Sequence, residues 1–157
     1  MNHIAPAAET ALPELGAPFE GGFYGGIIEN DDGSKHALIL PPMDEGESEQ
    51  ELTWEQAKEF CAALRIGGKD DWTMPTLRDM TAKRDRFFPD DDQIYPAQTK
   101  VEAFKKGGPE AFQANGYWTI TEFSAGYAWV QYFFNGDQLY DIKRHRWRVR
   151  AVRKYPL

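Results

Sequence analysis

The side chains that most often bind metals or act as nucleophiles are few and widely separated in this chain. Its three histidines are His3, His36 and His145, and none lies within ligand spacing of another histidine or of a cysteine. Cys61 is the only cysteine, which excludes a disulfide framework and a multi-cysteine zinc site. The run Asp90–Asp92 could attract Ca²⁺, but adjacent carboxylates outside an EF-hand frame bind it weakly, and a solvated charge cluster is favoured. The sequence therefore predicts no metal site and no cofactor.

Motifs that usually position catalytic groups are missing as well. A nucleophile elbow and a phosphate-binding loop need fixed glycine spacings, which Gly21-Gly22 and Gly25-Gly26 do not provide. Cys61 lies in a helical pattern among apolar neighbours, which indicates a small core residue. Carboxylates such as Glu122 and Asp137 could meet in space, but any acidic protein offers such pairs. We therefore predict that the protein is not an enzyme.

Charge is unevenly distributed along the chain, whose net charge is −7. Residues 1–60 hold thirteen acidic residues against two lysines, whereas Lys143–Lys154 holds seven basic residues and no acid. Trp147 among the arginines superficially fits a strand that binds nucleic acid. The negative net charge opposes that function, so we predict no nucleic-acid partner. Two interpretations stay open. The acidic half is solvated or pairs with the basic end within one chain, or opposite patches meet between chains and the basic end binds an acidic partner.

The first half of the chain must supply an arm, a hairpin and two helices. Residues 1–21 predict an extended arm, because their three prolines disfavour helices and central strands, and residues 22–157 predict one domain. Residues 23–29 and 35–40 flank a turn-rich linker and predict a hairpin. Thr53 with Gln56, and Thr76 with Asp79, predict two helix starts in capping-box geometry. We expect apolar stripes at residues 54, 57, 61 and 64 and at residues 77, 80, 84 and 87.

The second half is expected to be β after an irregular segment, residues 90–115, that holds one short helix near residues 101–104. Residues 117–122, 128–134, 138–143 and 146–153 predict strands, and Asn135-Gly136 predicts a two-residue hairpin turn. This order of elements indicates an α+β domain. The N-terminal residues lack the basic start and long apolar run of a signal peptide or membrane span, so we expect a soluble protein made in the cytoplasm, with no membrane partner.

Three stretches carry a resemblance to a known family. They are GGKDDWTMPTLRDM from Gly67, the helix TWEQAKEFCAALRIGG from Thr53, and the ending YWTITEFSAGYAWVQYFFNGD…RWRVRAVR from Tyr117. Together they resemble the Lcl C-terminal domain family over residues 22–153. That family is similar to the C-type-lectin-like fold, which includes variable ligand-binding proteins of phages and retroelement-diversified systems. The resemblance implies a C-type-lectin-like domain with two helices and an antiparallel sheet.

The resemblance also assigns roles to individual residues. It implies a structural framework made of Trp72, Pro75, Trp118, Trp129, Arg148 and Arg150. It implies a ligand surface on the final strands, made here of Phe123, Tyr127, Gln131, Tyr140, Arg144 and His145. Where the family usually carries an Asn/Ser/Tyr-rich recognition stretch, this chain has the charged residues 141–146.

These observations favour a non-catalytic module for binding or assembly. We expect a phage or prophage virion component, such as a decoration, tail or baseplate-associated protein, that contacts protein or glycan, including a host-surface ligand. Other virion subunits or copies of the same chain are the expected partners, since an exposed face rich in Tyr, Trp and Arg has the composition of interface hot spots. The alternative is a soluble cytoplasmic bacterial protein of the same fold with an enzymatic or ligand-binding activity that these patterns do not reveal.

Overall fold

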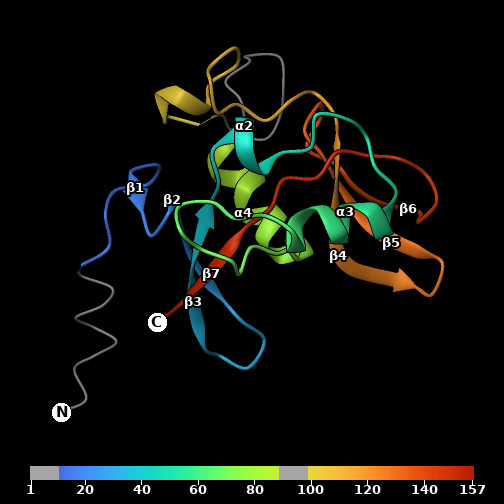
Figure 1. The fold of residues 1–157 in the computed structure, drawn as a ribbon, viewed down its shortest axis with the longest axis horizontal. Helices are drawn as coiled ribbons and strands as arrows, with labels where there is room; N and C mark the ends of the chain where they lie inside the picture. The colour runs from blue at the N-terminus through green and yellow to red at the C-terminus, as the bar shows by residue number, and fades with distance from the viewer. Residues whose placement is uncertain (1–10, 89–98) are drawn as a thin grey trace.

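The computed structural model describes residues 11–88 and 99–157. Two antiparallel sheets with helices beside them form the molecule (Figure 1), which confirms the α+β class. The strand order is β1-β2-β3-β7 in one sheet and β4-β5-β6 in the other. The strands are β1 (Pro18–Phe19), β2 (Gly22–Glu29), β3 (Lys35–Leu40), β4 (Gly116–Ser124), β5 (Tyr127–Tyr132), β6 (Gln138–Ile142) and β7 (Arg153–Pro156). The helices are α2 (Met43–Gly46), α3 (Trp54–Ala62), α4 (Leu77–Phe87) and the 3₁₀ helix η1 (Glu102–Phe104).

Both longer helices begin at the predicted capping boxes. The Thr53 hydroxyl accepts a hydrogen bond from the Gln56 backbone at the start of α3, and Thr76 does the same for Asp79 at the start of α4. The stripe predicted for α4 is correct only in part, because Lys83 is fully buried while Arg84 is not. The helix packs against β2, β4 and β5 at once, so a wider arc of its surface is covered than one apolar stripe supplies.

The chain end does not form the predicted strand over residues 146–153. Residues 147–152 make only isolated bridges, to Glu47, Leu52, Thr73 and Tyr117, and a regular strand begins at Arg153, where β7 pairs with β3. Val149, Arg150 and Ala151 are all fully buried. The segment is therefore enclosed on both sides, which the alternation of arginine with apolar residues did not predict.

The turn after β5 is longer than the two residues predicted from Asn135-Gly136. The strand ends at Tyr132, whose carbonyl accepts a hydrogen bond from Gly136 N. Phe133 leaves the strand because its ring is buried and stacks on Phe112, with 4.4 Å between ring centroids. Burial of this ring in the core overrides the local preference for a tight hairpin.

The free side of β2 is covered by arginines of α4. Arg86 donates from Nη1 to the Gly25 carbonyl at 2.7 Å and from Nη2 to the Ile27 carbonyl at 3.0 Å, and Arg78 donates to the Glu29 carbonyl at 2.6 Å. Gly26 makes room for this contact, since a Cβ there would lie 2.4 Å from Arg86 Nη1, and its φ of +92° suits glycine. Three alternate carbonyls in the part of β2 that β1 does not reach thus receive donors without a neighbouring strand.

Only part of the predicted arm is described, because residues 1–10 lie outside the described ranges. Its last residues join the first sheet: Gly16 N donates to the Tyr24 carbonyl, and β1 pairs with β2. The Phe19 ring lies 5.3 Å from that of Tyr155 in the last strand. Residues 16–21 are therefore attached to the domain, although the sequence placed them with the arm.

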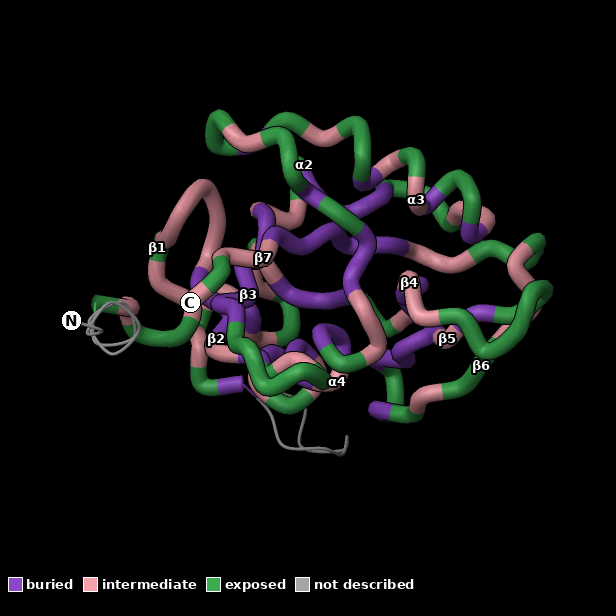
Figure 2. The backbone as a smooth tube through the Cα atoms, turned by 90° about the horizontal axis from the view of Figure 1, so that it is seen from below, coloured by how far each residue is buried: buried purple, intermediate pink, exposed green. Residues whose placement is uncertain are grey.

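The core lies where the two sheets and the helices meet, and Figure 2 shows the buried backbone running through the middle of the molecule. One hydrophobic cluster gathers the buried tryptophans Trp54, Trp72 and Trp118. A second gathers phenylalanines with Tyr117: Phe87, Phe88, Phe104, Phe112 and Phe133. The core therefore fills one side of the β4-β5-β6 sheet, which leaves part of the other side as a surface.

Candidate functional site

Four aromatic side chains gather on the outer side of the β4-β5-β6 sheet. Tyr127 and Trp129 alternate along β5 with the buried residues Ala128 and Val130, so they point away from the core. Tyr140 lies directly opposite Trp129 in the strand register. We call Phe123, Tyr127, Trp129 and Tyr140 the aromatic face.

The rings of the aromatic face pack on one another and remain open to solvent. Phe123 and Tyr140 are stacked with centroids 3.8 Å apart, and Trp129 meets both edge-on at 5.9 and 5.5 Å. Phe123 is 51% exposed, Tyr140 46% and Tyr127 38%. Mutual packing holds the rings in place before any ligand binds. Less side-chain entropy is therefore lost on binding.

The structure brings together three of the six residues predicted for the ligand surface, and Trp129, which was predicted as framework, lies among them. Gln131 does not belong to this surface. It is fully buried, and its side-chain amide donates to the carbonyls of Tyr132, Gly136 and Asp137. Gln131 thus braces the turn after β5, a role that only the folded turn reveals.

Arg144 and His145 are exposed on the turn after β6. His145 Nδ1 lies 2.9 Å from Asp141 Oδ1, and the Trp147 indole donates to Asp141 Oδ2 at 2.8 Å. Asp141 alternates with Tyr140, so its side chain leaves the opposite side of β6. These two predicted residues therefore border the sheet without joining the aromatic rings.

The other residues assigned to the framework are largely buried. The indoles of Trp72 and Trp118 donate to the carbonyls of Ile66 and Leu52. Arg150 is fully buried and donates to the carbonyls of Pro41 and Glu110 and to the Glu110 carboxylate, and Arg148 donates to the Ser48 carbonyl. Pro75 is buried, and its carbonyl accepts a hydrogen bond from Ile120 N in β4.

The basic chain end makes ion pairs within the molecule, and those to Glu47 join it to the acidic residues 1–60. Arg148 and Arg150 both approach the Glu47 carboxylate, and Arg153 pairs with Asp71 at 2.5 Å. Lys143 pairs with Glu122. Residues 147–150 bridge to Leu52, Tyr117 and Glu47, which brings Arg148 and Arg150 beside the Glu47 carboxylate.

Around Arg150 the interior holds several ionisable groups whose pKa values burial shifts. Burial raises the pKa of Glu47, although Arg150 nearby and the Tyr117 hydroxyl, which donates to it at 3.0 Å, oppose the shift. Burial also lowers the pKa of Lys83 to about 7, and the positive charge of Arg150 adds to this effect. The Lys83 ammonium donates to the Arg150 carbonyl at 2.9 Å.

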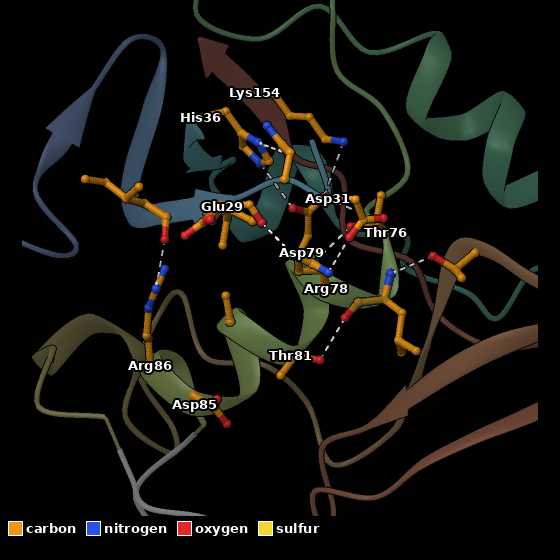
Figure 3. Close-up of a pocket in the computed structure, with 16 residues that line it drawn as sticks. Glu29, Asp31, His36, Thr76, Arg78, Asp79, Thr81, Asp85, Arg86 and Lys154 are labelled. Carbon is orange, nitrogen blue, oxygen red and sulfur yellow. Dashed lines mark hydrogen bonds and ion pairs between the residues drawn. The ribbon is translucent and has the colours of Figure 1, made fainter. Parts of the chain in front are cut away.

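A groove of about 870 Å³ lies between β2 and α4 (Figure 3). At its base His36 Nε2 lies 3.3 Å from Asp79 Oδ1, and both side chains are buried. Burial raises the pKa of Asp79, but hydrogen bonds from His36 and from Thr76 N outweigh it and leave the pKa below its usual value. His36 Nδ1 also contacts Asn30, so the groups that could transfer protons are held by neighbours.

No group of three or more His, Cys, Asp or Glu in residues 11–88 and 99–157 is arranged to hold a metal ion. The run Asp90–Asp92 lies outside the described residues. Within the described ranges, no helix has both the length and the apolar character needed to cross a bilayer. The candidate site of the described molecule is therefore the aromatic face. The groove between β2 and α4 is the second candidate.

Fold and site together define an α+β protein that displays an aromatic sheet face. The model of the Lcl C-terminal domain family matches residues 33–153, and the chain belongs to this family. Membership indicates a module of the binding type. A comparison with curated proteins gave no match.

Proposed function

We propose that the protein is a non-catalytic binding and assembly module whose macromolecular ligand contacts the aromatic face. The observation that carries this proposal is the set of four mutually packed, partly exposed rings on a sheet whose other side is core. Large exposed aromatic side chains in one place are costly in water unless a partner covers them. Tyr and Trp are also the residues that most often dominate binding energy at protein interfaces.

We also propose a setting for this module, namely a phage or prophage particle in which it serves as a decoration, tail or baseplate-associated protein. The support is the resemblance to variable binding proteins of phages, together with our proposal that the fold is C-type-lectin-like. In favour of that fold, the last strand β7 returns to pair with β3 near the start of the domain, and a separate three-stranded sheet carries the exposed face.

A double variant, Phe123→Ser with Tyr140→Ser, tests both proposals. We expect the variant to stay folded, with the free energy of unfolding lowered by about 1–2 kcal/mol, since both rings are half exposed but pack on one another. Two lost anchors of ~2 kcal/mol each should weaken partner binding roughly a hundredfold or more. Mass spectrometry of gradient-purified particles should then detect the wild-type protein and Phe134→Ser, a control at an exposed aromatic residue outside the aromatic face, but not the double variant.

Absence of the wild-type protein from such particles would refute the particle assignment. Equal incorporation of the double variant and the wild type would instead refute the role of the aromatic face.

We further propose that residues 1–21 act as an arm that contacts a neighbouring subunit in a homo-oligomer or virion assembly. Three prolines in this segment favour an extended chain, which suits wrapping around another surface. The shortened protein should start at Leu15, so that Gly16 and β1 are retained and keep their contacts with the sheet. We expect the full chain to show the larger mass by light scattering after gel filtration; equal masses would contradict the arm's role.

The second candidate is a soluble cytoplasmic protein that binds or converts a small molecule in the groove. One observation favours it: the buried pair His36–Asp79 at the base of an open concavity of about 870 Å³. Screening a fragment library by protein-detected NMR addresses this function. Ligands that shift the signals of His36 and Asp85 would support it, and a screen that leaves both unchanged would dismiss it.

A further inference from the structure

The two edges of the β4-β5-β6 sheet are treated differently. Along β4 the backbone groups that point away from β5 are paired: Trp118 N donates to the Arg148 carbonyl, Arg148 N donates to the Gly116 carbonyl, and Ile120 N donates to the Pro75 carbonyl. The chain end therefore closes this edge. Strand β6 forms the opposite edge of the sheet.

Hydrogen bonding fixes which backbone groups of β6 point outward. Tyr132 N donates to the Asp137 carbonyl and Lys143 N to the Gly126 carbonyl, so residues 137, 139, 141 and 143 direct their backbone groups to β5. Gln138, Tyr140 and Ile142 must direct theirs away. Ile142 is satisfied locally, by the Asp141 side chain and by His145 N. Within residues 11–88 and 99–157, nothing pairs with the outward N–H and C=O of Gln138 and Tyr140.

The side chains of this free edge are unusual for an unpaired strand. Proteins normally protect such edges with lysine, proline, a bulge or a covering element. This molecule covers the edge of β2 with the guanidinium groups of Arg86 and Arg78. At the free edge of β6 it instead exposes Leu139, 52% accessible, on one side and Tyr140 on the other. An open edge with exposed apolar side chains is the arrangement that accepts an added strand.

We infer that the β6 edge binds an extended polypeptide segment of another protein, in which basic residues flank an apolar one at two-residue steps. This inference rests on the proposed binding function and names the class of ligand. The outward N–H and C=O groups of Gln138 and Tyr140 match the spacing of donors and acceptors along an extended polypeptide. A glycan has no such regular backbone spacing.

Asp141, and Asp137 just before the strand, lie at alternate positions with Leu139 and so share its side. The Asp141 carboxylate accepts a hydrogen bond from the Trp147 indole and lies beside His145, and it keeps its negative charge because these contacts outweigh burial and lower its pKa. Lys or Arg at the matching positions of an added strand therefore complement both charges.

A second copy of this chain fits the same edge less well. Antiparallel pairing that satisfies Gln138 and Tyr140 of both copies would place Leu139 opposite Leu139 of the other copy. Asp137 would then face Asp141 on both sides of the two-fold axis, and like charges directly opposite one another destabilise strand pairs. Charge complementarity therefore favours a foreign, basic segment.

The test uses the full chain and a display library of short random peptides. Selection should enrich sequences that place Lys or Arg on both sides of an apolar residue at alternate positions. Leu139→Lys, which adds a positive charge at the centre of the exposed edge, should weaken the best peptide by about tenfold or more. Gln50→Lys is the matched control, since it adds the same positive charge at an exposed residue outside β6 and outside the arm, and it should bind as the wild type does.

Amide hydrogen exchange provides the second measurement. The enriched peptide should slow exchange at Gln138 and Tyr140, and N-methylation of its backbone next to the apolar residue should abolish the slowing. Unchanged exchange at these amides with bound peptide would overturn the inference, and so would enrichment that Leu139→Lys leaves intact. If exchange at these amides slows with rising protein concentration in the absence of peptide, a second copy of the chain binds the edge, and the inference would also be overturned. Loss of particle incorporation in the double serine variant, with no effect of Leu139→Lys on peptides, would leave the aromatic-face function standing alone.

Discussion

Replacing Arg150 with alanine is expected to lower the free energy of unfolding by about 3–5 kcal/mol, the range for breaking a buried charge pair by removing one partner. Its guanidinium is fully buried and donates to two carbonyls and to the Glu110 carboxylate, while Glu47 lies within ion-pair distance. The alanine would remove the cation that pairs with Glu110 and leave Glu47 with Arg148. It would also open a cavity beside Phe112, whose ring lies 4.6 Å from the guanidinium carbon.

Urea denaturation followed by far-ultraviolet circular dichroism measures this loss. Arg146→Ala is the matched control, because Arg146 is exposed and bonds only to the Gln56 side chain, and it should stay within about 0.5 kcal/mol of the wild type. Equal midpoints for the two variants would show that Arg150 does not hold the interior together.

Replacing Lys83 with methionine is expected to stabilise the protein by about 1–4 kcal/mol at pH 6, and the gain should shrink as pH rises. Burial lowers the pKa of Lys83 in the folded state from 10.5 to about 7. Between these values the unfolded chain binds a proton that the folded chain does not, so the wild-type free energy of unfolding rises with pH in this window. Below pH 7 both states are protonated, and the burial of charge has its full cost.

The measurement is the difference in unfolding free energy between Lys83→Met and the wild type at several pH values from 6 to 10. Lys58→Met, at a partly exposed lysine, should show no such trend. A pH-independent difference for Lys83→Met would mean that the amine keeps its ordinary pKa in the interior.

Local sequence patterns were sufficient for the elements whose geometry depends on near neighbours. Thr53 with Gln56 and Thr76 with Asp79 marked both helix starts, since a capping box involves residues only three positions apart. The hairpin of β2 and β3 followed from the turn-rich linker that separates the two segments. The family resemblance, and not a local pattern, led us to expect three residues of the aromatic face, namely Phe123, Tyr127 and Tyr140.

Contacts between distant segments decided the rest. Trp129 lies on the exposed face and Gln131 in the interior, although both point to the same side of β5, because the turn after β5 covers only one end of that side. The edge of β2 depends on Arg86, sixty-one positions from the Gly25 carbonyl that it binds. No local pattern encodes such a contact.

By itself, then, the sequence determined the class of fold, the family, the helix starts and the strands that carry the aromatic face. Tertiary structure alone decided that Lys83 and Arg150 are buried, that the chain end runs between the two sheets, and that β4 is covered while β6 is free. The physical reason is that capping and alternation are short-range properties of the chain. Burial of charge and coverage of strand edges depend on which distant segments the packed core brings together.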